Sequence, residues 1–292
     1  MLDVTRLRVL AAVARCGSVT AAARALGYAQ ASVSHHIARL EAETGSQLVQ
    51  RAGRGIRLTE AGLMLAQRAD EILGRLDAAE ADLAAYTGLR AGRVRLAAFP
   101  SALGTFVPRA AAAFVAEHPD VDLRFTEAEP PDAVRLLRAG EVDVAVLFTY
   151  PDTADDTGLR RIRLLTEPIY LVTPLDVAGD RLADHAAARW ITGCERCRAH
   201  LVHSCAEAGF RPDIAFTTDD YLAVQALVAA GLGVTTLPGL ALTAQRHSRV
   251  RAVRLPGPGR RIDAAVYGQP PDPPATATLL AHLTRAARNA RT

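Results

Sequence analysis

Seven apolar residues in the first third of the chain are spaced alternately four and three positions apart, and this spacing constrains the fold most. They are Leu65, Ala69, Ile72, Leu76, Ala79, Leu83 and Tyr86. An apolar seam with a period of about 3.5 residues is typical of a helix that pairs with another helix. We therefore expect a long helix over about residues 59–88 that joins two copies of the chain. The alternative is an amphipathic helix that packs on its own domain.

The segment before this helix has the pattern of three short helices followed by a hairpin. Gly17 and Gly27 would end the first two helices in the left-handed conformation that glycine adopts readily. The third helix is expected over about residues 30–43, with Gly45 after it. The arginine- and glycine-rich segment 51–55 then forms the turn of a basic wing. A helix, a tight turn and a second helix are the helix-turn-helix plan, whose second helix enters the DNA major groove.

The distribution of charge supports a nucleic-acid-binding head. The whole chain carries a net charge of +3. Residues 1–60 contain eight arginines and four acidic residues, a net charge of +4, so the other 232 residues together carry −1. A basic excess confined to one end of a chain is the electrostatic footprint of nucleic-acid binding. The partner that we expect is double-stranded DNA.

The third helix has a polar face opposite its apolar stripe of Val33, Ile37 and Leu40. On that face, His35 and Arg39 could donate hydrogen bonds to guanine. The DNA contacts that we expect from the two helices and the wing are Ser18, Thr20, Gln30, Ser32, Ser34, His35, Arg39, Arg51, Arg54 and Arg57. The simpler alternative is an ordinary solvated helix face. Adjacent helical residues diverge by about 100°, so His35 and His36 do not form a metal pair.

From residue 92 onward, strands alternate with helices. The first unit has expected strands at 94–99, 121–125 and 142–148, and expected helices at about 101–117 and 131–140. The second has strands near 169–173, 191–192, 214–216 and 234–237, and helices near 195–207 and 221–230. A strand at 262–267 and a C-terminal helix follow. This order predicts parallel, doubly wound sheets.

Several helices of this region begin directly after strands, so their N-termini point out of one edge of a doubly wound sheet. Free backbone N–H groups at such termini favour an anionic ligand. The residues that we expect to line an effector site there are Ser101, Ala102, Thr149, Tyr150, Gly193, Cys194, Thr218 and Asp219. The alternative is that their side chains only cap the helices.

The chain has four cysteines, Cys16, Cys194, Cys197 and Cys205, which are too few for a disulfide scaffold. Cys194 and Cys197 form a CxxC that opens a helix, where the helix dipole would favour the thiolate of Cys194. The pair could close a disulfide or, with His200 one turn on, bind a soft metal ion. The simplest interpretation is a structural role in the cleft. We assign no metal and no cofactor.

Long runs of residues resemble the LysR-type transcriptional regulators. In the head they are Leu7-Arg-Val-Leu-Ala-Ala-Val-Ala, Gly17-Ser-Val-Thr-Ala-Ala-Ala-Arg-Ala-Leu, Ser34-His-His-Ile-Ala-Arg-Leu-Glu and Gly53-Arg-Gly-Ile-Arg-Leu-Thr-Glu-Ala-Gly; later they are Leu137-Arg-Ala-Gly-Glu-Val-Asp-Val-Ala-Val and Val228-Ala-Ala-Gly-Leu-Gly-Val. The resemblance implies a dimerising linker helix, a two-lobed effector domain like a periplasmic binding protein, and usually a tetramer. Two positions depart from the family's pattern: Ala29 stands where Ser or Thr is usual, and Ala31 where Pro is usual.

The expected fold class is α/β, with an all-α winged helix-turn-helix at the N-terminus. Residues 1–59 would form the DNA-binding domain, 60–91 the linker and dimerisation helix, and 92–292 the effector-binding domain. In that domain, lobe I is expected at about 92–164 plus 265–292, and lobe II at about 165–264.

The sequence predicts a DNA-binding transcriptional regulator whose operator binding is modulated by a small molecule held between two α/β lobes. We found no nucleophile elbow, phosphate loop or zinc-protease helix, so we expect no enzyme. Two alternatives are a solute-binding protein for transport and an enzyme with Cys194 as nucleophile. The N-terminus lacks the pattern of an export signal, and no apolar run is long enough to span a bilayer. We therefore expect a cytoplasmic protein without a membrane partner.

Overall fold

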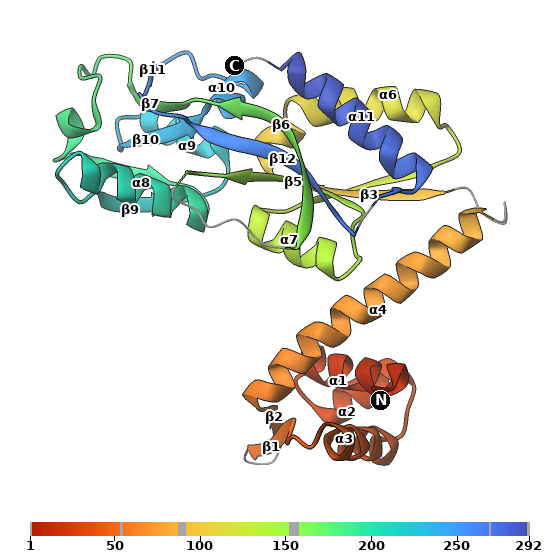
Figure 1. Ribbon diagram of the computed structural model, residues 1–292. Helices are drawn as coiled ribbons and strands as arrows, with labels where there is room; N and C mark the ends of the chain where they lie inside the picture. The colour runs from red at the N-terminus through yellow and green to blue at the C-terminus, as the bar shows by residue number, and fades with distance from the viewer. Residues whose placement is uncertain (1, 53–54, 87–91, 152–157, 269, 291–292) are drawn as a thin grey trace. The chain divides into compact units, whose positions relative to one another are not determined.

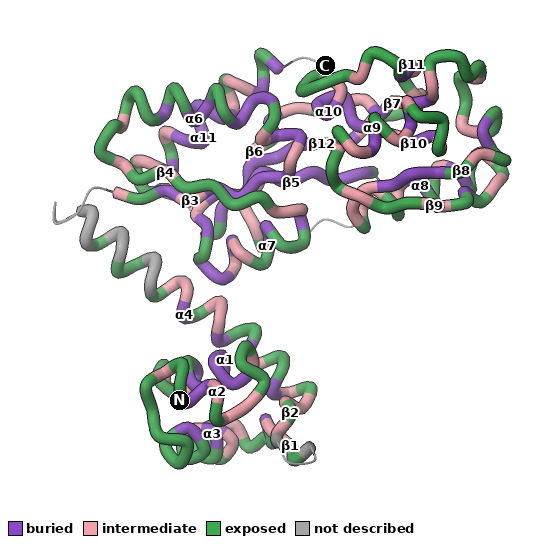
Figure 2. Tube along the Cα trace, turned by 180° about the vertical axis from the view of Figure 1, so that it is seen from behind, coloured by how far each residue is buried: buried purple, intermediate pink, exposed green. Residues whose placement is uncertain are grey.

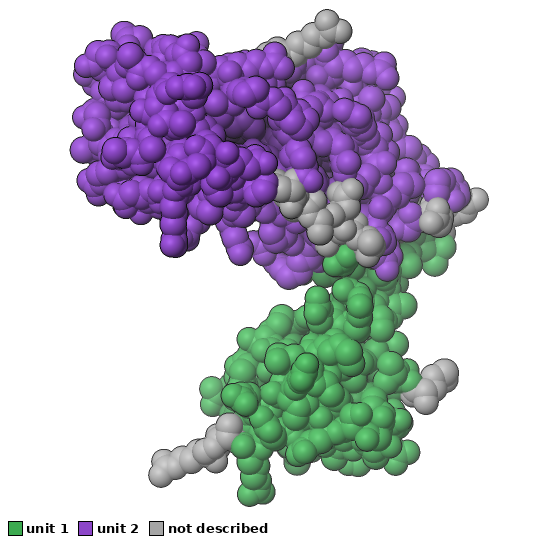
Figure 3. Space-filling model, turned by 60° about the vertical axis from the view of Figure 1, so that its left-hand side comes forward, with its two compact units in different colours: residues 1–90, 138–141 green, residues 91–137, 142–292 purple. Residues whose placement is uncertain are grey.

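The computed structural model shows the chain as two compact units, which are described separately (Figure 3). One unit contains residues 1–90 and 138–141, and the other contains residues 91–137 and 142–292. The structure describes residues 2–52, 55–86, 92–151, 158–268 and 270–290.

The first unit contains a small head and one long helix (Figure 1). Its elements are α1 (Val4–Cys16), α2 (Val19–Leu26), α3 (Gln30–Thr44), β1 (Val49–Ala52), β2 (Gly55–Leu58) and α4 (Glu60–Tyr86). The three short helices contact one another around an apolar core, and β1 pairs antiparallel with β2. The helix-turn-helix, the hairpin and the long helix expected from the sequence are therefore confirmed.

Local sequence explains the helix ends of the head. Gly17, Gly27 and Gly45 follow the three helices with φ values of 68°, 68° and 63°, a conformation that favours glycine. At the start of α2, the Oγ of Ser18 accepts a hydrogen bond from the backbone N–H of Ala21 at 3.1 Å. This bond satisfies one of the free N–H groups at the helix N-terminus.

The apolar seam of α4 lies in two different environments. Ala69 is buried against α1 in the head. Further along the helix, Ile72, Leu76 and Leu83 are 39 %, 41 % and 64 % exposed within this unit. The side chain of Tyr86 lies outside the described part. The seam thus begins as part of the head's own core and continues as an exposed apolar stripe, for which pairing with a second copy stays a prediction.

The second unit contains two five-stranded sheets. The first has the order β4 (Asp122–Glu127), β3 (Arg93–Ala98), β5 (Val144–Thr149), β12 (Arg260–Tyr267), β6 (Leu159–Glu167). The second has the order β11 (Val250–Arg254), β7 (Ile169–Pro174), β10 (Val234–Pro238), β8 (Arg189–Thr192), β9 (Asp213–Thr217). Buried residues follow β5 and β12 through the centre of the first sheet (Figure 2).

Helices cover both faces of each sheet. They are α5 (Pro100–Leu103), α6 (Phe106–Glu117), α7 (Pro130–Arg138), α8 (Glu195–Glu207), α9 (Tyr221–Ala229), α10 (Gly239–Ala244) and α11 (Pro274–Arg288), with the short 3-10 helix η1 (Leu182–His185). On the first sheet, α6 and α11 lie side by side on one face and α7 packs on the other. On the second, α8 and α9 pack on opposite faces.

The expectation of parallel sheets is wrong in part, because both sheets are mixed. β12 is antiparallel to β5 and β6, and β7 is antiparallel to β10 and β11. The strands β6 and β11 were not expected. Three arginines in β6 obscure its apolar pattern, and each has a polar partner: Arg160 pairs with Asp272, Arg161 with Asp263 and Arg163 with Thr166. Asp272 and Asp263 lie about 100 residues along the chain from their arginines, so a local pattern does not reveal them.

The expected single helix at 101–117 is two helices, α5 and α6. Thr105 leaves the helical conformation, with φ −130° and ψ −90°, and its hydroxyl donates to the carbonyl of Ser101 at 2.6 Å. The chain passes from the first sheet to the second between Glu167 and Ile169 and returns at Arg260. The expected lobe boundaries at about 164 and 265 therefore fall inside β6 and β12.

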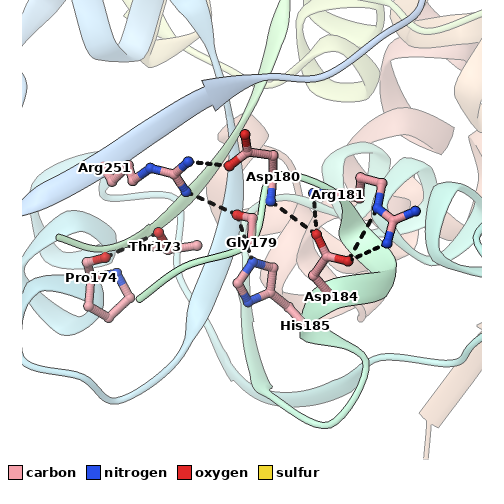
Figure 4. A network of polar contacts seen from close by, with 8 residues as sticks. All are labelled: Thr173, Pro174, Gly179, Asp180, Arg181, Asp184, His185 and Arg251. Atoms are coloured by element: carbon pink, nitrogen blue, oxygen red, sulfur yellow. Dashed lines mark hydrogen bonds and ion pairs between the residues drawn. The ribbon is translucent and has the colours of Figure 1, made fainter. Parts of the chain in front are cut away.

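A polar network holds the loop between β7 and β8 (Figure 4). The Arg251 guanidinium donates to the carbonyl of Gly179 at 3.0 Å and also pairs with Asp180. The Asp184 carboxylate accepts hydrogen bonds from Arg181, and these bonds hold the pKa of Asp184 at about 2. Within the described residues, no helix is both long enough and apolar enough to cross a membrane.

Candidate functional site

The exposed face of α3 carries half of the residues that the sequence predicts to contact DNA. Val33, Ile37 and Leu40 of this helix are buried in the head. Its five predicted contact residues are all exposed: Gln30, Ser32, Ser34, His35 and Arg39. His35 and Arg39 lie opposite the buried stripe, Ser32 and Ser34 flank that face, and Gln30 is the first residue of the helix. The helix α3 therefore presents a polar face that can enter a groove without disturbing the core.

The N-termini of α2 and α3 are built differently. The hydroxyl of the half-buried Ser18 caps α2, whereas Thr20, within its first turn, is exposed. Ala29 occupies the N-cap position of α3 and its side chain forms no capping bond. Its carbonyl still accepts hydrogen bonds from the N–H groups of Ser32 at 3.0 Å and Val33 at 3.2 Å. The helix therefore begins where the sequence predicts, without a capping hydroxyl.

Ala29→Ser should stabilise the head by about 0.5–1 kcal/mol, because the new hydroxyl can accept a free N–H of the first turn of α3. Slower amide hydrogen exchange along α3 in the full-length protein would show this gain. Ala31→Ser is the matched control, since a hydroxyl inside the first turn is not at the N-cap. Equal exchange rates in wild type and Ala29→Ser would contradict the prediction.

The hairpin places two of its arginines on opposite faces. Arg57 pairs with Gln50, while Arg51 pairs with Ile56, one position further along. Successive side chains in a strand alternate between faces, so Arg51 lies on the face of Ile56, which packs against the head's core. Both arginines are exposed. The third predicted wing residue, Arg54, lies outside the described residues.

In the second unit, a small cavity of about 20 Å³ lies between the two sheets. The predicted effector residues that line it are Tyr150, Gly193, Cys194, Thr218 and Asp219. Three other predicted residues, Ser101, Ala102 and Thr149, are buried and do not line it. A larger groove of about 620 Å³ shares Ile169 and Thr236 with the cavity, and that volume is in the usual range for small-molecule sites.

A fully buried ion pair lies next to the cavity. Arg260 donates through Nε to Glu167 Oε1 at 2.7 Å and through Nη2 to Ser101 Oγ at 2.9 Å. The other carboxylate oxygen of Glu167 accepts the N–H of Leu240 at 2.6 Å. The guanidinium carbon lies 4.2 Å from the ring centroid of Phe148. Burial opposes the charge of Arg260, but Glu167 and the neighbouring acidic groups keep its pKa well above the usual value.

The two thiols of the CxxC lie in contact at the N-terminus of α8. Cys194 Sγ is 2.9 Å from Cys197 Sγ, and Tyr150 Oη donates to Cys197 Sγ at 3.6 Å. The hydrogen bond from Cys194, helped by Arg260, lowers the pKa of Cys197 despite its burial. The same bond and burial raise the pKa of Cys194. The expectation that Cys194 carries the thiolate is therefore wrong, because Cys194 is the donor of the pair.

His200 and Glu129 correct the expected surroundings of this pair. The ring of His200 stacks on Tyr150, with centroids 4.0 Å apart. The group of possible ligands found among the described residues consists of Glu129, Cys194 and Asp219. Neither His200 nor Cys197 belongs to it, but Cys197 contacts the Sγ of Cys194 directly. Burial raises the pKa of Glu129, and its Oε2 is buried with no hydrogen-bond partner in the described part of the chain.

Sequence reasoning missed Glu129, Glu167 and Arg260. Glu129 precedes a proline-initiated helix and Arg260 follows a Gly/Pro-rich turn, which are ordinary positions for solvated charges. Glu167 ends a strand that was itself unexpected. Only long-range contacts distinguish these residues, so no local signal could have identified them.

Two sequence profiles of one family match most of the chain. The profile described as "Bacterial regulatory helix-turn-helix protein, lysR family" matches residues 4–63, and "LysR substrate binding domain" matches residues 87–288. A "Probable hydrogen peroxide-inducible genes activator" of Mycobacterium avium is 34% identical over 88% of this chain and 85% of its own length. The "HTH-type transcriptional regulator PtxR" of Pseudomonas aeruginosa is 33% identical over 89% of this chain and 84% of its own length.

Solved structures share the whole fold. CbnR, a LysR family transcriptional regulator, covers 98% of this chain and 99% of its own, with 24% identity and a TM-score of 0.67. Full-length CbnR complexed with its target DNA gives a TM-score of 0.66 at 23% identity, over 98% and 100% of the two chains. The relatives are transcriptional regulators and not enzymes. The chain therefore belongs to the LysR family of DNA-binding transcriptional regulators that respond to effectors.

Proposed function

We propose that residues 1–59 bind operator DNA, that residues 60–91 join two copies of the chain, and that residues 92–292 sense an effector. The observation that carries this proposal is the exposed polar face of α3, opposite its buried stripe. The direct base contacts come from Gln30, Ser32, Ser34, His35 and Arg39. Thr20, Arg51, Arg54 and Arg57 contact the phosphates, and Ser18 acts mainly as a helix cap. A protein of the same fold has been solved with its target DNA.

The effector acts from the crevice between the two sheets, lined by Tyr150, Gly193, Cys194, Thr218 and Asp219. Ser101 contributes indirectly, since its hydroxyl holds Arg260 beside that crevice. Dimers form through the exposed stripe of α4 and assemble further into tetramers. A regulator of this kind acts where the chromosome is, so we place the protein in the cytoplasm.

Arg39→Ala should weaken binding to the operator by about 1–3 kcal/mol and relax the base preference at one position of the half-site, because it removes a base contact. Arg51→Ala should instead weaken binding to all DNA sequences and reduce the salt slope by about 1, because it removes a phosphate contact. Fluorescence anisotropy with the upstream DNA of the gene, at several salt concentrations, measures both effects.

Arg246→Ala is the matched control for both variants. It removes an exposed arginine from the second unit and should leave the affinity and the salt slope unchanged. If Arg39→Ala behaves like this control, then α3 is not the recognition helix.

A further inference from the structure

We propose that Cys194, Cys197, Glu129 and Asp219 form a binding site for a divalent, thiophilic cation such as Zn²⁺. All four side chains line the same cavity of about 20 Å³. Ligand atoms of Glu129, Cys194 and Asp219 lie within 4.8 Å of one another, and the Sγ atoms of Cys194 and Cys197 are 2.9 Å apart. One sulfur and two oxygen ligands thus lie close together, and Cys197 Sγ adjoins this group through its contact with Cys194.

The ligand set selects one class of cation. Zinc accepts thiolate and carboxylate ligands in tetrahedral geometry, whereas Mg²⁺ and Ca²⁺ prefer oxygen ligands alone. Thiolates bound to tetrahedral zinc lie about 3.8 Å apart, so the two thiols would separate by about 0.9 Å on binding. Cys197 lies in the first turn of α8 and Cys194 at its N-cap.

A cation in this cavity would also provide a partner for a buried carboxylate oxygen of Glu129. Oε2 of Glu129 is buried without a hydrogen-bond partner in the described residues, and burial of such an oxygen is costly. A cation in the cavity would bind this oxygen. The second shell is already present, because Tyr150 Oη donates to Cys197 Sγ at 3.6 Å and fixes the orientation of that thiol.

The four ligands come from both lobes of the effector domain. Glu129 directly precedes α7, which packs on the first sheet. Cys194 and Cys197 belong to the start of α8, and Asp219 lies between β9 and α9 of the second sheet. A bound cation would therefore tie the two lobes together. Through this closure the cation would act as an effector, and that consequence rests on the function proposed above.

Zinc binding by the purified full-length protein tests the site without DNA. In competition with a chromophoric chelator, the wild type should bind one Zn²⁺ per protomer at this site. Cys197→Ser should lower the affinity by about 100-fold or more, and Asp219→Asn by about 10-fold or more. Cys16→Ser and Glu195→Gln are matched controls, since Cys16 lies in the head and Glu195 is an exposed carboxylate beside Cys194. Both controls should bind zinc like the wild type.

Cobalt absorption provides a second readout of the site, and circular dichroism separates loss of the site from loss of folding. Co²⁺ bound by the wild type should show thiolate-to-cobalt charge-transfer absorption. This absorption should weaken in Cys194→Ser, while circular dichroism confirms that the variant is folded. Zinc affinity equal in wild type and Cys197→Ser would overturn the proposal. So would a Cys194–Cys197 disulfide that forms in mild peroxide equally fast with and without zinc.

Operator binding then tests the regulatory part separately. Zinc should change the operator affinity of the wild type and leave that of Cys197→Ser unchanged. Zinc bound at this site without any change in operator affinity would overturn its role as an effector. Absence of operator binding with and without zinc would instead count against the proposed DNA-binding function.

Discussion

Glu167→Ala is expected to lower the free energy of unfolding of the effector domain by about 3–5 kcal/mol, the usual cost of leaving one partner of a buried ion pair without the other. Glu167 and Arg260 are both fully buried. The substitution leaves Arg260 with Ser101 as its remaining hydrogen-bond partner in the described residues, and it also removes the acceptor of the Leu240 N–H.

Trp190 provides a specific signal for this measurement. It is the single tryptophan of the chain and is fully buried in the second unit. Urea unfolding followed by its fluorescence therefore reports on the effector domain. Glu207→Ala, which removes an exposed glutamate of α8, should change the free energy of unfolding by less than about 0.5 kcal/mol.

A double variant distinguishes an unpaired charge from simple loss of packing. Adding Arg260→Met to Glu167→Ala removes the orphaned charge and keeps much of the side-chain volume, so it should recover part of the lost stability. If the double variant is less stable than Glu167→Ala, the loss does not come from a buried unpaired charge.

Leu76→Glu is expected to convert the oligomer to smaller species and to weaken operator binding strongly. Leu76 is 41 % exposed in the described unit, between Ile72 at 39 % and Leu83 at 64 %. In a symmetric helix pair, two glutamates would enter the same apolar seam, where burial of like charges is costly. Sedimentation at low micromolar concentration measures the assembly, and anisotropy with operator DNA measures the affinity.

Leu63→Glu is the matched control on the same helix. Leu63 is 59 % exposed and lies about 140° around the helix from Leu76. It should leave the assembly unchanged. A Leu76→Glu protein that sediments like the wild type would show that the exposed stripe of α4 is not the dimer seam.

The head was almost fully predictable from the sequence, because its signals are local. Ser18 and Gly27 mark the ends of α2, and the stripe of Val33, Ile37 and Leu40 identifies the face of α3 that is buried. Caps and helical periodicity act over a few residues, so the order of residues determines them directly. The polar face with Arg39 follows from the same periodicity.

Tertiary structure decided the sheets and the cavity. The strands β6 and β11 pair with partners far along the chain. Both sheets are mixed because β12 runs antiparallel to β5 and β7 runs antiparallel to β10, and the direction of a strand leaves no mark in its own sequence. Arg260 meets Glu167 across 93 residues. Glu129 and Cys194 likewise meet only once two lobes have formed. The sequence by itself therefore determined the family, the helices of the head and the polar face of α3, where short-range forces dominate. Which charges and thiols share the buried crevice depended on long-range packing, because apolar burial assembles the sheets and polar groups acquire their partners only then.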